Sequence, residues 1–174
     1  MKKNILFYGL ITGLIVTAMM VVTTIMCYQN PNFEDSTIIG LGVMIAAFSF
    51  VYIGIKDFRD KENGGFITFG RAFQIGLYIT LIASTMYVAV WLIEYYLFMP
   101  DFMDKYAAHA LNKAKAAGAD KMEIFEKSVD MANMKEMYNN PLLVILITYC
   151  EILPVGLIIT LISGLILKKE RKIA

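Results

Sequence analysis

The sequence contains a single histidine, His109, and few of the residue combinations on which catalytic sites are built. One histidine excludes a metal site made of several histidines. A Ser-His-Asp set cannot form within the apolar stretches, because His109 lies outside them. The phosphate-binding pattern GxxxxGK followed by Ser or Thr is also missing. We therefore predict no catalytic residue, no metal ligand, no cofactor-binding residue and no cofactor, which favours a protein that is not an enzyme.

Charged residues are scarce as well. They make up 18% of the chain, whereas a soluble domain carries about 25%. Hydrophobic residues make up 58%, and they gather in four long blocks separated by charged segments. This pattern indicates an integral membrane protein whose surroundings are the lipid bilayer. The net charge is only +1, and without a clustered basic face it argues against a nucleic-acid partner.

Each apolar block is long enough to cross a bilayer as a helix, since one crossing takes about 20 residues. The first block is longer than the roughly 7–15 apolar residues of a cleavable signal peptide, and no Ala-x-Ala-like site follows it, so we expect it to be retained. The predicted fold class is all-α: an integral membrane four-helix bundle in one domain, 1–174. Its helices are predicted at about 5–27, 37–55, 71–98 and 142–167.

Lysine and arginine fall on alternate sides of these helices. The loop at 27–36 has neither and carries Glu34 and Asp35. Because basic residues near helix ends are retained in the cytoplasm, we predict a multi-pass protein whose termini and middle loop are both cytoplasmic. The basic residues that support this orientation are Lys2, Lys3, Lys56, Arg59, Lys61, Arg71, Lys168, Lys169, Arg171 and Lys172.

The two cysteines fall toward the same side of the membrane in this topology. Cys27 is expected near the surface, and Cys150 roughly two to three helical turns deep. A disulfide needs Cα atoms within about 7 Å of each other. We therefore predict that both cysteines are unpaired.

The segment at about 100–140 is predicted to be extracytoplasmic and helical. One helix is expected from Asp101 to Ala117, and Gly118 then breaks it. Asp120 can cap a second helix that ends near Tyr138, before an Asn-Asn-Pro sequence. The amphipathic spacing suits a helix pair on the membrane surface or over the mouth of the bundle. A partner-binding helix is the alternative.

Two acidic residues are expected inside the bilayer. Glu151 lies deep in the fourth helix, where a charge costs about 3 kcal/mol, and Pro154 follows it and kinks the helix. With Glu94 of the third helix they form a candidate intramembrane polar site, in which Glu151 is either a structural hydrogen-bonding group or a functional one. Glu94 lies near the outer end of the third helix among Trp91 and tyrosines, so an interfacial aromatic belt is the favoured interpretation.

Small residues four apart form stripes on the first and fourth helices. Such stripes let helix backbones approach closely, so we predict that these two helices contact each other along them. The alternative is that glycine is simply common in membrane helices. The stripes consist of Gly9, Gly13 and Thr17 on the first helix and Gly156, Thr160 and Gly164 on the fourth.

The cytoplasmic loop carries the most distinctive local pattern. Gly64 and Gly65 form a turn that tolerates positive φ. The residues after the turn, Phe66, Ile67 and Phe69, are expected to dip into the headgroup region. Arg71 is expected to reach the lipid phosphates.

These loop residues also support a resemblance. The stretches at 50–61 and 64–73, with Leu153-Pro154-Val155-Gly156 and the basic tail, resemble the bacterial membrane family listed as domain of unknown function 4199. The resemblance covers essentially the whole chain. It implies a bacterial inner-membrane protein with four helices, and it brings no activity, ligand or site residue.

Three functions remain open. The first is a non-enzymatic accessory or scaffold protein that binds a membrane-protein partner, or a second copy, through its bundle or its outer helices. The second is a small transporter or channel component that uses Glu151; an inverted repeat would have favoured it, but no convincing repeat is present. The third is a lipid-binding protein or membrane enzyme that uses the aromatic and basic loop.

Overall fold

The computed structural model describes residues 1–29 and 37–169, and within these ranges the chain consists of helices joined by short turns, with one isolated bridge and no strand. This confirms the all-α prediction. Residues 30–36, which include Glu34 and Asp35, lie outside the described residues, as do Arg171 and Lys172. The elements are α1 (Lys2–Gln29), α2 (Thr37–Asp57), the π-helical turn η1 (Phe58–Glu62), α3 (Phe69–Ile93), the π-helical turn η2 (Glu94–Phe98), α4 (Phe102–Ala116), α5 (Lys121–Tyr138) and α6 (Pro141–Leu167).

Four of the described helices are long and apolar enough to cross a membrane. Their bounds follow the four predicted blocks within a few residues, except at the end of the second, where the helix continues past the predicted residue 55. The extension carries charges that are paired along the helix: Lys61 contacts Asp57 at 2.6 Å, and Arg59 contacts Asp60 at 2.6 Å. The four spans are Lys2–Gln29, Gly40–Glu62, Phe69–Phe98 and Pro141–Leu167.

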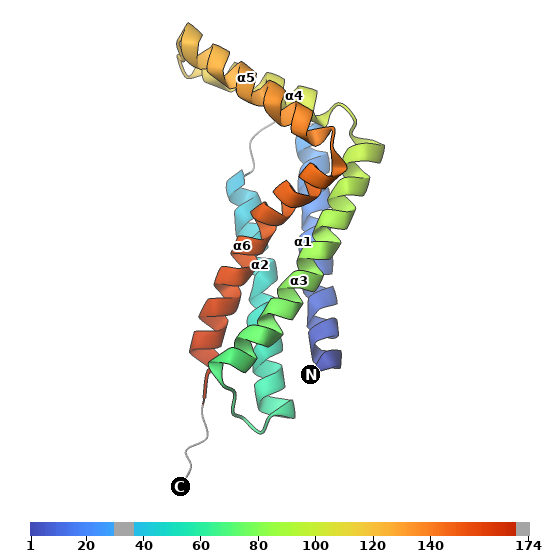
Figure 1. Cartoon of the computed structure of the whole chain (residues 1–174), viewed down its shortest axis with the longest axis vertical. Coiled ribbons are helices and arrows are strands. Elements are labelled where there is room, and N and C mark those ends of the chain that lie inside the picture. The colour runs from blue at the N-terminus through green and yellow to red at the C-terminus, as the bar shows by residue number, and fades with distance from the viewer. Residues whose placement is uncertain (30–36, 170–174) are drawn as a thin grey trace.

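The helix α3 is the centre of the bundle, because its contacts with α1 and α6 are the most extensive between helices and it also contacts α2 (Figure 1). The core lies where α2, α3 and α6 meet. Fully buried large side chains fill it, with no exposed surface. They are Phe48, Val51, Ile55, Ile75, Ile79 and Ile152.

The predicted contact between the two small-residue stripes is wrong, because both stripes face other helices, chiefly α3. A Cβ on Gly9 would lie 2.9 Å from Ile82 of α3, and one on Gly13 would lie 2.5 Å from the sulfur of Met86. On α6, a Cβ on Gly156 would meet Thr80 of α3 and the Phe48 ring of α2.

Gly164, at the end of the second stripe, faces Phe69 of α3. The stripes therefore do permit close helix packing, as predicted. A small residue shows where a neighbour can come close, but it does not say which helix that neighbour belongs to.

The turn between α2 and α3 adopts the predicted backbone. Gly64 has φ +66° and Gly65 has φ +84°, both in the left-handed region. One of the residues predicted to dip into the headgroup region, Ile67, differs from the prediction. Ile67 is 2% exposed, and its backbone pairs with Lys169 through hydrogen bonds of 2.9 and 2.8 Å. It is therefore held inside the protein and does not dip into headgroups, because the pairing draws it against the end of α6.

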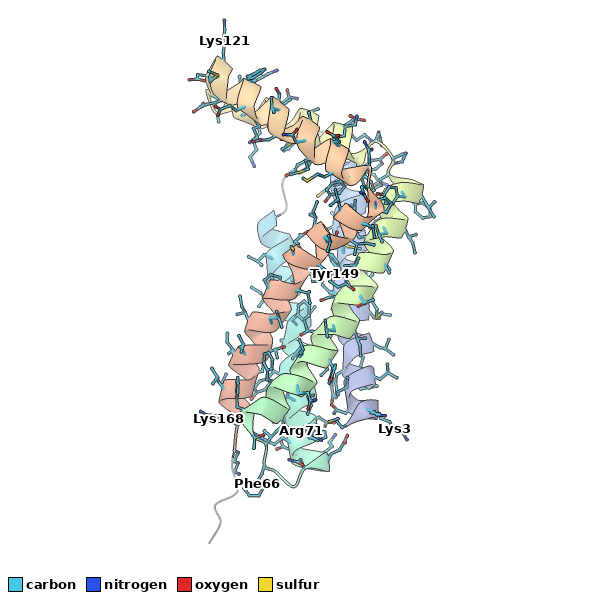
Figure 2. The ribbon with its side chains drawn as sticks, viewed as in Figure 1. Lys3, Phe66, Arg71, Lys121, Tyr149 and Lys168 are labelled. Atoms are coloured by element: carbon cyan, nitrogen blue, oxygen red, sulfur yellow. The ribbon has the colours of Figure 1, made fainter. Side chains whose placement is uncertain are left out.

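These contacts join both ends of the described chain to the same loop. The amino group of Met1 pairs with Glu62, and the guanidinium of Arg59 donates to the carbonyl of Leu167 at 3.4 Å. We call this part of the bundle the terminal end. Figure 2 shows Lys3, Arg71 and Lys168 at this end, whereas Lys121 lies at the far tip of the outer helices.

Replacing Gly65 by alanine is expected to lower the free energy of unfolding by about 1 kcal/mol, because an L-residue is strained at positive φ. The matched control is Gly70→Ala. Gly70 has open space around it and lies within α3, so alanine there should leave stability unchanged or raise it slightly. Thermal unfolding of the purified protein in detergent measures both. Equal effects of the two substitutions would contradict the argument.

Candidate functional site

The outer helices α4 and α5 form a hairpin whose bounds match the prediction closely. Gly118 has φ +80° between them. Asp120 caps α5 through a full capping box with Glu123, with hydrogen bonds of 2.8 and 3.0 Å. Figure 1 shows the hairpin over the end of the bundle opposite the terminal end, extending beyond it to one side. We call this the hairpin end.

Polar contacts fasten the hairpin to the bundle. The hydroxyl of Tyr28 donates to Asp101 and lowers the pKa of that carboxyl. The ammonium of Lys105 lies 3.6 Å from the centre of the Tyr28 ring. The hydroxyl of Tyr96 donates to the carbonyl of Tyr138 at 2.9 Å. The base of the hairpin is therefore anchored to α1 and to the end of α3.

Farther out, the hairpin stands clear of the bundle. The helix α5 has no buried residue. Met122 and Phe125 are 66% and 63% exposed, and Val129 is 42% exposed. The partner or surface that would cover these residues stays a prediction.

A pocket of about 350 Å³ lies beneath the base of the hairpin, and five helices contribute to its wall. We call it the mouth pocket. Its wall combines aromatic rings, methionines and one carboxylate. The lining residues are Met20, Thr24, Tyr87, Trp91, Phe102, Met103, Tyr106, Met134, Tyr138, Thr148 and Glu151.

Glu151 is the acidic group of the mouth pocket. It reaches the pocket from α6, and one turn before it the Thr148 side chain donates to the carbonyl of Val144 at 2.7 Å. Burial raises the pKa of Tyr138 to about 12, and the charge of Glu151 adds to the shift. Tyr138 is therefore a neutral phenol at ordinary pH.

The structure separates Pro154 from Glu151. Pro154 is exposed and does not line the mouth pocket. Within α6 it removes the N–H that would pair with the carbonyl of Cys150. Of the three residues in the predicted polar site, Glu151, Pro154 and Glu94, only Glu151 lines this pocket.

Glu94 is buried within the protein near the end of the third span. Its exposed fraction is 5%, and neither carboxylate oxygen has a hydrogen-bond partner in the part of the chain that the structure describes. It lines a second cavity of about 440 Å³ between α1 and α3, which we call the side crevice. The lining residues are Val21, Ile25, Tyr28, Gln29, Val90, Ile93, Glu94, Phe98 and Met99.

The two cavities share no lining residue, so the two acids belong to separate sites. The loop residues Gly64, Gly65 and Arg71 are far from both, at the terminal end. Arg71 lies there with its guanidinium 5.9 Å from the centre of the Phe58 ring. The three candidate groups predicted from the sequence therefore do not form one site.

Most of the residues that line the two cavities were not predicted from the sequence. The sequence feature that could have indicated these cavities is the density of aromatic residues between 87 and 106, on both sides of the turn into the hairpin. The cysteines lie outside both linings: Cys27 is half-buried, Cys150 is exposed, and no disulfide joins them.

Comparison with known proteins identifies a family for nearly the whole chain. Residues 7–169 match the family model described as protein of unknown function (DUF4199). No curated protein and no solved structure matches this chain.

Proposed function

Since this chain belongs to the DUF4199 family, whose description records no activity, we propose its function from the mouth pocket. We propose that it is a non-enzymatic accessory protein of the membrane that binds a small organic cation in this pocket, with Glu151 as the counter-ion. The observation that carries the proposal is one carboxylate in a pocket that five aromatic side chains also line.

The chemistry of the wall favours a cation over a neutral or anionic ligand. A carboxylate attracts a positive charge, and aromatic faces add cation–π attraction of about 0.5–2 kcal/mol each. Trp91, Phe102 and Tyr106 supply such faces, and the neutral phenol of Tyr138 supplies another. An anionic ligand would meet the like charge of Glu151 instead.

The packing below the pocket supports ligand binding more than transport of the ligand across the membrane. Phe48, Ile79 and Ile152 fill the bundle there and have no exposed surface. Thr80 and Thr160 join α3 to α6 through a buried hydroxyl–hydroxyl hydrogen bond of 3.1 Å. A ligand that enters from the hairpin end therefore meets a packed core, which disfavours the transporter interpretation.

We also propose the orientation in the membrane. Lys3, Arg71 and Lys168 lie at the terminal end, close to the ends of the spans (Figure 2), whereas the six lysines of the hairpin are balanced by seven acidic residues. The positive-inside rule then places the terminal end in the cytoplasm. The hairpin and the mouth pocket lie outside it, and the bacterial inner membrane is the proposed location. This orientation gives ligands from outside the cell membrane access to Glu151.

The intrinsic fluorescence of Trp91, the single tryptophan, tests the binding proposal directly, because this residue lines the mouth pocket. Choline and spermidine, as probe cations, are expected to change the emission in a saturable way. The uncharged choline analogue 3,3-dimethyl-1-butanol is expected to leave the emission unchanged. Glu151→Gln is expected to weaken cation binding about ten- to a hundredfold, because a charge-assisted contact is lost.

The matched control is Glu94→Gln, the same substitution in the other cavity, which should leave the cation affinity unchanged. Two results would contradict the proposal. One is that organic cations and their neutral analogues alter the emission equally or not at all. The other is that Glu151→Gln binds the cations as tightly as the original protein.

A further inference from the structure

Glu94 is the least satisfied polar group in the described bundle. Only 5% of its surface is exposed, and both carboxylate oxygens lack a hydrogen-bond partner among the described residues. A buried carboxylate without partners costs free energy, because it has lost its hydration and gained nothing in return. A bound group that donates hydrogen bonds and carries positive charge would remove this cost.

The cavity beside Glu94 has the shape and chemistry of a slot for an apolar chain. Its walls are almost wholly apolar and include Val21 and Val90. Several lining residues also face the outside of the bundle: Ile25 is 40% exposed, Ile93 51% and Phe98 70%. The side crevice therefore opens between α1 and α3 onto the lateral surface, which faces the bilayer in a membrane-spanning bundle.

The polar rim of the crevice indicates the depth of the acid. Tyr28 and Gln29 line the crevice at the end of α1, and Lys105 lies over the Tyr28 ring. Glu94 precedes the end of η2 at Phe98 by four residues, which corresponds to roughly 6 Å along a helix. A group that pairs with Glu94 therefore lies just below the polar boundary of the hairpin end.

We propose that the side crevice binds an amphiphile whose primary ammonium group pairs with Glu94 and whose apolar chain lies between α1 and α3. A primary ammonium has three N–H donors, so it can satisfy both carboxylate oxygens. A quaternary ammonium has no N–H donor and leaves both oxygens without hydrogen bonds. The ammonium comes either from a lipid headgroup, as in phosphatidylethanolamine, or from a free long-chain amine.

This site is independent of the mouth pocket, since the two cavities have no residue in common. Its ligand also differs in kind. The mouth pocket takes a small cation from the aqueous side, whereas the side crevice takes a chain from the bilayer. Either proposal can fail without the other.

The test is native mass spectrometry of the full-length protein incubated with phosphatidylethanolamine, phosphatidylcholine or phosphatidylglycerol of matched chain length. The protein is expected to retain phosphatidylethanolamine preferentially, and Glu94→Gln is expected to reduce that retention about tenfold or more. Glu151→Gln serves as the matched control and should retain the lipid normally. A separate arm uses dodecylamine, whose binding in place of the lipid would identify a free amine as the source.

A second variant keeps the test decisive if Glu94→Gln folds poorly. Ile25→Trp fills the crevice from an exposed position, so it should block retention while the bundle remains intact. Val22→Trp is its control, because Val22 is 52% exposed and does not line the crevice. Equal retention of all three lipids and no binding of dodecylamine would overturn the proposal. Normal retention by both crevice variants would overturn it as well.

Discussion

Gly156→Leu is expected to destabilise the bundle by about 3 kcal/mol, at the upper end of what overpacking in a core usually costs. A Cβ at this position would lie 2.4 Å from Cγ2 of Thr80 and 2.8 Å from the Phe48 ring. Neither neighbour can move into open space, because both are fully buried. The helix α6 must therefore shift away from both α2 and α3.

The shift would also break polar contacts that hold α6 to α3. The Thr80 hydroxyl lies 3.5 Å from the carbonyl of Gly156 and 3.1 Å from the hydroxyl of Thr160. Buried hydroxyls without partners add to the cost. In a chain of this size, we expect the unfolding temperature in detergent to fall by roughly 6–12 °C.

Gly42→Leu is the matched control. Gly42 lies in the membrane-spanning part of α2, and a Cβ there would meet nothing within 4 Å. Leucine at this position should leave the unfolding temperature unchanged or raise it slightly, because it favours helix more than glycine does. If Gly156→Leu unfolds at the same temperature as Gly42→Leu, the close packing of α6 on α2 and α3 is not what holds the bundle.

Reporter fusions are expected to give an all-or-none difference between two glycine turns. Alkaline phosphatase, which is active outside the cytoplasm, should be active when fused at Gly118 and inactive at Gly64. The physical reason is that the basic residues at the terminal end resist transfer across the membrane. Both turns have open space around them, so the fusions should disturb the fold little.

A fluorescent protein that folds in the cytoplasm provides the reciprocal control. It should fluoresce at Gly64 and remain dark at Gly118. Phosphatase activity at Gly64, or its absence at Gly118, would overturn the proposed orientation. The same result would move the mouth pocket to the cytoplasmic side and change which ligands can reach Glu151.

Local features of the chain were predictable because they depend on nearby residues. The bounds of α5 follow from the cap at Asp120 and from the Asn-Asn-Pro sequence after Tyr138. The turn at Gly64 and Gly65 follows from the freedom of glycine at positive φ. Glu151 could be singled out because an acid deep in an apolar helix is rare.

The relations between distant segments were not predictable in this way. The small-residue stripe on α6 has the same sequence pattern whether α6 packs on α1 or on α3. The packing on α3 decides which glycines have no room for a larger side chain. Glu94 lies among aromatic residues in sequence, so it resembles an interfacial acid. It is buried because α1 and η2 close around it. Membrane partners and second copies of the chain stay predictions.

By itself, the sequence determined that this protein has four helices able to cross a membrane, an outer helical hairpin and an acid in the fourth helix. These features depend on hydropathy, capping residues and glycine turns. Each acts over one or a few helical turns, so it can be recognised in the sequence. The tertiary structure alone decided that α3 is central and that the two acids occupy separate cavities. Those outcomes depend on how side chains from different helices fill space together, and spacing along one helix carries no information about that.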